Sequence, residues 1–187
     1  MAIANDNVIM RFQRGKIGGL IFRVWGQNTV VSKAPDYSKI PRSEAQKANS
    51  NRFKVATRYG RRVLNDPVAF AFYDKKRRGN QTVWNVAISD YMKRPEIAEI
   101  DVWNYSGQEG NTIRVKARDN YCVASVNVMI INASGFEVES GMAVQMPGSE
   151  VWVYKTKEEN TEWKGGKVVV RVTDRPGNVT QSVKLPE

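Results

Sequence analysis

Three carboxylates are the residues whose type and position most suggest chemistry. Asp101, Asp119 and Asp174 each lie near the end of a segment with strand-like alternation, where carboxylates from different loops can gather. Such a group could provide the paired acids of a hydrolase or oxygen ligands for calcium. Aspartates in turns more often accept backbone hydrogen bonds. We therefore predict no metal ion, no cofactor and no catalytic residue.

The chain contains no histidine and a single cysteine, Cys122. The absence of histidine excludes a His-dependent triad and a His-ligated zinc or haem site. One cysteine excludes an intrachain disulfide and a two-Cys metal site. As a nucleophile Cys122 would need a base, and its position at the start of an apolar strand is typical of a small hydrophobe. We expect a protein that is not an enzyme, and we identify no small-molecule substrate.

The positive charge of the chain is the remaining feature that suggests a binding function. Residues 1–100 contain 19 Lys and Arg against 8 Asp and Glu, a net charge of +11, whereas residues 101–187 contain 10 against 11, a net charge of −1. This asymmetry favours a polyanionic partner such as nucleic acid or an acidic protein surface; a basic surface without a partner is the alternative. The candidate contact residues are Lys47, Lys54, Arg58, Arg61, Arg62, Lys75, Lys76, Arg77 and Arg78.

A predicted helix over residues 43–64 positions the first five of these cations. Ser43 and Gln46 have the spacing of a capping box, which marks a helix start. At about 100° per residue the cations share one face, and an apolar face lies opposite. The apolar face consists of Ala45, Ala48, Val55, Ala56, Tyr59 and Val63. Arg52 interrupts it, so its side chain should either extend to solvent or meet a carboxylate.

Two shorter helices are predicted to follow. Asp66 and Pro67 are typical of a helix start, and residues 75–80 then form a basic turn that either is solvated or contacts an anion. The third helix carries apolar residues at helical spacing and ends before Pro95. Its apolar residues are Val83, Trp84, Ala87, Ile88, Tyr91 and Met92.

Residues 8–34 read as strands, beginning with Val8 to Phe12. The runs at 20–25 and 29–33 flank a short glycine-containing connection and predict a β-hairpin. Glycines before it could cradle a phosphate, but that requires a following helix, and a strand follows instead. Basic residues alternate with aromatic ones here. We predict that this hairpin contacts a partner through Gly15, Lys16, Gly18, Phe22, Arg23 and Trp25.

From residue 97 onward the period is that of strands. Seven short runs are separated by turn residues, at 97–103, 112–118, 123–132, 136–144, 150–156, 167–174 and 179–185. This number and spacing predict an antiparallel β-sandwich of immunoglobulin-like architecture. The predicted fold class is α+β with two domains. Residues 1–95 form a β-hairpin and a basic three-helix domain, and residues 96–187 form the sandwich.

Two resemblances can be named on these residues. The segment from Val170 to Val179, with Asp174 and Gly177-Asn178, resembles the last hairpin of bacterial immunoglobulin-like and fibronectin-like modules. The first 95 residues resemble a group of small proteins from Bacteroidota and phages, through a glycine-rich start leading to Phe-Arg and a Ser-x-x-Gln helix. The matching residues are Gly15, Gly18, Phe22, Arg23, Lys33, Pro35, Ser43, Gln46, Arg52 and Phe53. The resemblance implies a structural or assembly role and no catalytic residues.

We therefore expect a non-enzymatic structural or assembly protein that contacts protein partners or copies of itself in a larger particle or filament, phage-like or bacterial. The alternative is a nucleic-acid-binding protein that uses the basic helical face. No apolar run is long enough to cross a membrane, and the first residues lack the pattern of a signal peptide. The expected location is cytoplasmic or particle-associated.

Overall fold

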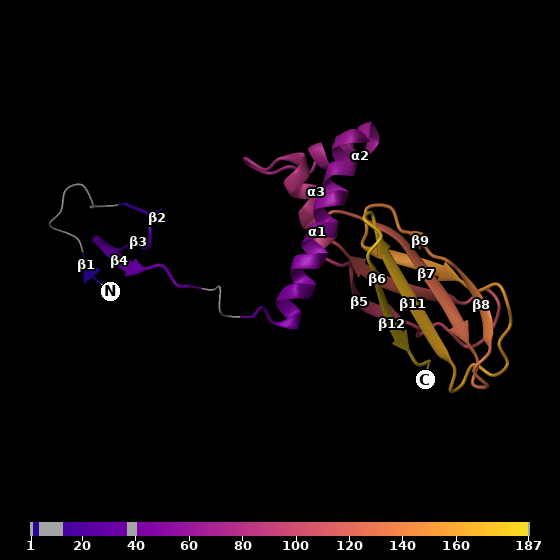
Figure 1. Ribbon diagram of the computed structural model, residues 1–187. Coiled ribbons are helices and arrows are strands. Elements are labelled where there is room, and N and C mark those ends of the chain that lie inside the picture. Colours follow the sequence, from indigo (N-terminus) through magenta and orange to yellow (C-terminus); the bar gives the residue numbers. More distant parts are fainter. Residues whose placement is uncertain (1, 4–12, 37–40, 187) are drawn as a thin grey trace. The chain divides into compact units, whose positions relative to one another are not determined.

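The computed structural model describes residues 2–3, 13–36 and 41–186 (Figure 1). It combines helices with antiparallel sheets, which confirms the α+β class. The chain divides into two compact units, Met1–Lys47 and Ala48–Glu187. The boundary drawn from the sequence after residue 95 therefore falls inside the second unit.

The first unit contains one antiparallel four-stranded sheet. Its strands are β1 (Ala2–Ile3), β2 (Gly15–Ile17), β3 (Leu20–Trp25) and β4 (Asn28–Lys33), in the order β1-β4-β3-β2. Gly26, with φ of 62°, lies in the two-residue connection between β3 and β4. A positive φ is what such a turn requires and glycine permits. The strand expected from Val8 to Phe12 lies outside the described residues.

Three helices follow, α1 (Glu44–Asn65), α2 (Pro67–Asp74) and α3 (Val83–Met92). The capping box of α1 is confirmed, because the backbone N–H of Ser43 donates to Gln46 Oε1 at 3.1 Å and that of Gln46 donates to Ser43 Oγ at 3.3 Å. Asp66 caps α2 by accepting from two backbone N–H groups. Local sequence signals thus locate the helix starts correctly.

The second unit ends in two antiparallel four-stranded sheets. One has the order β5-β6-β10-β9 and the other the order β12-β11-β7-β8. The strands are β5 (Glu96–Asp101), β6 (Thr112–Arg118), β7 (Val123–Ile131), β8 (Glu137–Met142), β9 (Val144–Gln145), β10 (Val151–Lys155), β11 (Lys167–Asp174) and β12 (Val179–Lys184). Each of the seven predicted runs contains a strand, and the two-residue β9 is additional.

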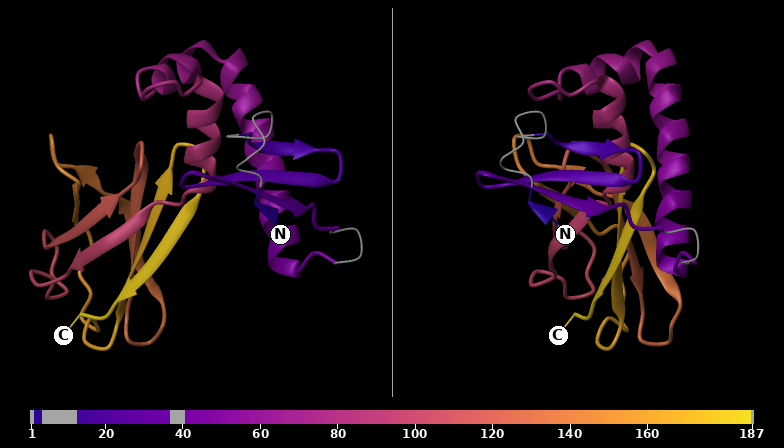
Figure 2. Two further views of the ribbon diagram at one scale, coloured as in Figure 1. Left: turned by 90° about the vertical axis from the view of Figure 1, so that its left-hand side faces the viewer. Right: turned by 60° about the vertical axis from the view of Figure 1, so that its left-hand side comes forward.

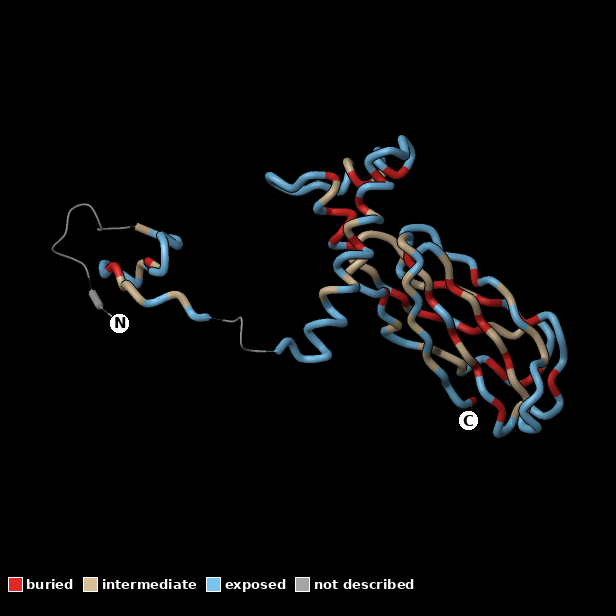
Figure 3. The backbone as a smooth tube through the Cα atoms, in the orientation of Figure 1, coloured by how far each residue is buried: buried red, intermediate tan, exposed pale blue. Residues whose placement is uncertain are grey.

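The two sheets share one hydrophobic core, as expected of a β-sandwich. Alternate residues of each inner strand are buried, for example Val168, Val170 and Val172 on β11 and Ile113 and Val115 on β6. Figure 3 shows this alternation along the strands of the sandwich. A period of two buries one face of each sheet against the other.

A second, smaller core holds the helices together. It contains Val63, Ala69, Tyr73, Val83, Val86 and Ala87. Gly60 of α1 is buried at this contact, where a Cβ atom would lie 2.9 Å from Cδ1 of Trp84 on α3. The absence of a side chain at Gly60 therefore lets α1 approach α3 closely.

The predicted apolar face of α1 is only partly buried. Ala56 and Val63 are buried and Tyr59 is half-buried, but Ala45, Ala48 and Val55 are exposed. These three expectations are wrong because burial on α1 is confined to the stretch from Ala56 onward, where α3 packs. Arg52 is half-buried and forms no salt bridge with a carboxylate of the described residues. Its Nη2 atom is buried without a hydrogen-bond partner there.

Hydrogen bonds connect the helices to one end of the sandwich. Figure 2 shows α2 and α3 at that end and the C-terminus at the other. In the turn between β11 and β12, Asn178 Nδ2 donates to the carbonyls of Tyr91 at 3.1 Å and Lys93 at 3.3 Å. Thr180 Oγ1 donates to the carbonyl of Pro95 at 2.5 Å. These hydrogen bonds therefore connect the backbone at the end of α3 and just after it to β12 and to the turn that precedes β12.

Candidate functional site

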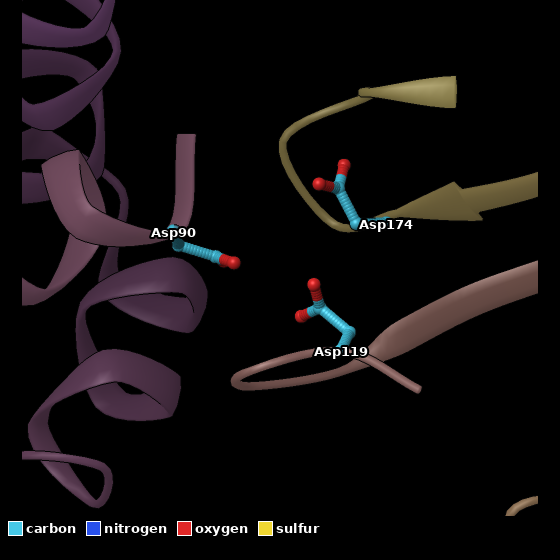
Figure 4. A group of neighbouring side chains, drawn as sticks. All are labelled: Asp90, Asp119 and Asp174. Carbon is cyan, nitrogen blue, oxygen red and sulfur yellow. The ribbon is translucent and has the colours of Figure 1, made fainter. Parts of the chain in front are cut away.

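Three aspartates meet where the helices join the sandwich. Asp90 lies on α3, Asp119 follows β6, and Asp174 ends β11. One carboxylate oxygen from each lies within 4.8 Å of the other two. In Figure 4 the carboxylate of Asp90 projects from α3 towards those of Asp119 and Asp174. We call these three residues the aspartate cluster.

Two members of the cluster also organise turns. Asp119 Oδ2 accepts the backbone N–H groups of Tyr121 and Cys122, both at 2.9 Å. Asp174 Oδ1 accepts those of Gly177 at 2.9 Å and Asn178 at 2.6 Å. These are the turn roles that we expected for sequence aspartates, and they hold both carboxylates in place.

Asp90 is different, because its carboxylate lies on the buried side of a helix. The Tyr73 hydroxyl donates to Asp90 Oδ2 at 2.6 Å, and the hydroxyl oxygens of Tyr73 and Tyr59 lie 2.7 Å apart. Asp90 is fully buried, and its Oδ1 atom has no hydrogen-bond partner among the described residues. A buried carboxylate oxygen without a partner is costly in free energy and calls for an explanation.

Burial also changes the acidity of these groups. Burial raises the pKa of Asp90 from 3.8 to about 7. The negative charges of Asp119 and Asp174 act in the same direction. The hydrogen bond from Tyr73 and the positive charge of Arg175 act against it. The pKa of Asp174 is raised mainly by burial as well, and the pKa of Tyr73 is raised by burial and by its bond to Asp90. In the absence of a bound cation, Asp90 is therefore protonated below about pH 7, well above the range in which an exposed aspartate ionises.

The sequence anticipated part of this cluster. Asp119 and Asp174 were among the three aspartates that we considered as a possible group, although turn roles were favoured. Asp101 does not belong to the cluster, and it instead accepts the Trp103 N–H at 2.9 Å. Asp90 was not among the candidates. Its position seven residues after Val83, on the stripe that also buries Val86 and Ala87, was the available signal. A carboxylate on an apolar helix stripe must find a polar environment in the interior.

The predicted basic residues of α1 are all exposed. At about 100° per residue, Lys54, Arg58 and Arg61 lie opposite the buried residues Ala56, Gly60 and Val63. Lys47 belongs to the first unit and forms a salt bridge with Glu44 at 2.7 Å. Within the described residues, none of Lys54, Arg58, Arg61 and Arg62 forms a salt bridge.

The basic turn between α2 and α3 lines a polar cavity. The cavity measures about 510 Å³ and has five cations in its lining, Lys75, Lys76, Arg77, Arg78 and Lys93. Gln81, Ser89, Asn120 and Tyr121 add hydrogen-bonding groups. Arg77 is paired with Asp74 at 2.8 Å, and the other four form no salt bridge within the described part of the chain. This cavity can bind a phosphate or carboxylate group.

The register of the first sheet separates the predicted contact residues onto its two faces. Directly paired residues share a face, so Lys16, Arg23 and Trp25 lie on one face and Phe22 lies on the other. Trp25 is 79% exposed, whereas Phe22 is buried. Because Phe22 is buried, its side chain does not belong to the exposed face on which Lys16, Arg23 and Trp25 lie. Gly15 and Gly18 have positive φ angles and shape the turn region.

Cys122 and two tryptophans of the sandwich lie outside both the aspartate cluster and the basic cavity. Cys122 is half-buried, and its Sγ lies 3.4 Å from the carbonyl oxygen of Val123. Trp152 belongs to the sandwich core, whereas Trp103 is 91% exposed.

Among the described residues, no helix combines the length and apolar character needed to span a membrane. Comparison with known proteins found no matching family model, no matching curated protein and no matching solved structure.

Proposed function

We propose that this protein is a non-enzymatic structural or assembly protein whose first unit docks onto a protein partner, either another chain or a second copy of its own. The observation that carries this proposal is the exposed face of the first sheet. Lys16, Arg23 and Trp25 lie together on it, and Trp25 is 79% exposed. Exposed tryptophan and arginine are the residues that most often dominate protein interfaces.

The limited interior of the first unit supports the same conclusion. Among its described residues, Phe22 and Thr29 are the ones that are buried, while Ile17 and Leu20 are exposed. A small sheet that buries so little gains stability by covering its apolar residues with a partner. A unit with so few buried residues is expected to bind a partner that covers its exposed apolar side chains, as an assembly module does.

The edge of the sheet offers a second mode of contact. Within the described residues β2 pairs on one side only, and Gly15, Lys16 and Ile17 are all exposed. An exposed edge strand presents unpaired N–H and C=O groups to which a strand from another chain can add. Strand addition at this edge is one way in which the predicted hairpin could contact its partner.

Solution size tests this proposal. Light scattering and negative-stain microscopy of the full chain should show concentration-dependent association, or a protein partner should be recovered in pull-downs. Trp25→Ser should reduce the association, whereas Trp103→Ser, which removes an even more exposed tryptophan from the second unit, should not. A strictly monomeric protein that recovers no partner would contradict the proposal.

A second candidate function, nucleic-acid binding, is favoured by the basic cavity and by the exposed cations of α1. Four cations around the cavity and four on α1 form no salt bridge within the described residues. Unpaired, exposed cations next to hydrogen-bonding side chains are suited to a phosphate backbone. An acidic protein surface would satisfy the same charges, so the test must separate the two.

Salt dependence provides that test. If the cations neutralise phosphates of duplex DNA, log affinity should fall linearly with log salt, with a slope of about 0.9 per phosphate contacted. Replacing Arg58, Arg61 and Arg62 with Gln should lower the slope and weaken binding to a fluorescently labelled duplex. The same variant should still assemble if assembly depends on the first unit. A salt-independent affinity, or no binding at low salt, removes this candidate.

The strand order supports a finer description of the sandwich. If β5 to β12 are lettered A, B, C, C′, D, E, F and G, the two sheets have the orders A-B-E-D and G-F-C-C′. This matches the arrangement of immunoglobulin-like sandwiches, and we take the second unit to contain such a module. We take the paired strands β3 and β4 to be the predicted N-terminal hairpin, and an immunoglobulin-like module behind it would suit a docking role. The fold alone does not identify a partner.

A further inference from the structure

We propose that Asp90, Asp119 and Asp174 form a binding site for a divalent cation, with calcium as the preferred ion. The site lies at the junction of α3 with the ends of β6 and β11. A cation there would join the helical segment to both sheets of the sandwich. This inference is independent of the partner proposed above.

The spacing of the carboxylates fits an ion of this size. One oxygen from each aspartate lies within 4.8 Å of the other two. Calcium binds oxygen at 2.3–2.6 Å, so two ligands on opposite sides of the ion are separated by roughly 4.6–5.2 Å. The three oxygens can therefore contact one ion with only small side-chain movements.

Asp90 provides the independent evidence for a ligand. The residue is 0% exposed, its Oδ2 is satisfied by Tyr73, and its Oδ1 has no hydrogen-bond partner in the described part of the chain. Figure 4 shows this carboxylate directed at the other two aspartates. A buried carboxylate that has an unpaired oxygen and faces two further carboxylates lacks a positive partner, and a cation supplies it.

Among the described side chains, no cation pairs directly with the cluster. None of the three aspartates forms a salt bridge with a described cation. Arg175 follows Asp174 directly, but its guanidinium carbon lies over the Phe72 ring, 4.4 Å from the centroid. Turn hydrogen bonds to Asp119 and Asp174 come from neutral donors and leave lone pairs on their oxygens. Arg175 therefore offsets the negative charge of the cluster only through space, and no described cation pairs with it directly.

The neighbouring amide of Asn120 can adapt to the ion. With its nitrogen turned towards Asp119, the amide donates to Asp119 Oδ1 at 3.1 Å and Oδ2 at 3.3 Å. Turned by 180°, it would present an oxygen to the same place, as an additional neutral ligand.

The ligand set selects the class of ion. Carboxylate oxygens suit calcium, magnesium and manganese, whereas zinc prefers nitrogen and sulfur. Ligands from three separate elements, two of them constrained by turns, favour calcium, which accepts irregular geometry, over magnesium, which requires a near-ideal octahedron.

The test uses the full chain, stripped with a chelator and titrated with CaCl2. Binding should be saturable by calorimetry and should raise the melting temperature. Asp90→Asn and Asp174→Asn should each weaken calcium binding at least ten-fold, while Asp101→Asn, which alters a turn aspartate outside the cluster, should leave it unchanged. Asp90→Asn preserves side-chain shape and an acceptor for Tyr73.

A second measurement does not depend on how the variants fold. Terbium added to the unmodified protein should show luminescence sensitised by nearby tyrosines such as Tyr73, and calcium should displace it more effectively than magnesium. The absence of calcium binding at millimolar concentration, calcium binding that survives Asp90→Asn, or terbium luminescence that calcium does not displace would each overturn the proposal.

Discussion

The sandwich and the helical segment of the second unit are stabilised by different means. The sandwich core consists of apolar side chains from two sheets, mostly valine and isoleucine. The helical core is smaller and is built around the hydrogen-bonded chain from Tyr59 through Tyr73 to Asp90. Apolar burial depends little on pH or ions, whereas a buried carboxylate depends on both. We therefore expect the helical segment to respond to solution conditions and the sandwich to resist them.

The largest effect should follow from damage to the sandwich core. Ile113 is completely buried between the sheets, and Ile113→Ala removes packing and leaves a cavity. The free energy of unfolding should fall by about 2–5 kcal/mol, equally at pH 5 and pH 8. Urea denaturation at both pH values measures this. A loss that differed markedly between them would contradict the claim that the sandwich is insensitive to pH.

The pH dependence of stability should come from Asp90. Its pKa is 3.8 unfolded and about 7 folded, so the folded state holds a proton that the unfolded state has released between these values. Its contribution to stability is complete below about pH 4, decreases as the pH rises to about 7, and is constant above that. Over this range the loss is at most about 4 kcal/mol.

Asp90→Asn removes this contribution, because an amide does not titrate. Denaturation curves recorded with chelator from pH 4 to pH 8 should therefore be flatter for the variant than for the unmodified protein. Curves that run parallel over this range would show that Asp90 does not titrate as its burial implies. Asp101→Asn, outside the cluster, serves as the control.

A smaller effect is expected from the hydroxyl of Tyr73. Tyr73→Phe removes the donor to Asp90 Oδ2 and leaves both carboxylate oxygens without a protein partner, so the free energy of unfolding should fall by about 1–3 kcal/mol. Tyr59→Phe keeps the bond from Tyr73 to Asp90 and should cost less. Thermal unfolding of both variants checks the order. An equal loss for the two would mean that the hydroxyl pair, rather than the carboxylate, carries the stability.

The smallest effect should follow from changes to the basic face. Arg58, Arg61 and Arg62 are exposed and form no salt bridge with described residues. Their joint replacement by Gln should change stability by less than about 0.5 kcal/mol per site, even though it alters polyanion binding. Thermal unfolding at low salt measures this. A large loss would indicate a structural role for the cations.

Local signals predicted most of the elements of this fold. Alternation located the strands of the sandwich, and the caps at Ser43 and Asp66 located two helix starts, because these features depend on neighbouring residues. The exposed cations of α1 followed from helical periodicity in the same way.

Features that depend on tertiary contacts were harder to predict. The aspartate cluster joins residues that are distant in the sequence, so spacing could not show that Asp90 belongs to it or that Asp101 does not. Likewise, the register of the first sheet places Phe22 and Trp25 on opposite faces but does not show that Phe22 is buried. The exposure of Ala45 and Ala48 follows from where the α3 contact ends. Periodicity shows which residues share a face but not which part of that face is covered.

The side chain of Asn178 has a consequence for any attempt to shorten the protein. Its amide donates to the carbonyls of Tyr91 and Lys93, and Thr180 donates to that of Pro95. A fragment starting at residue 96 would lack all three acceptors and would expose Asp174 to water. The smallest autonomous piece that retains the sandwich intact should therefore include α3.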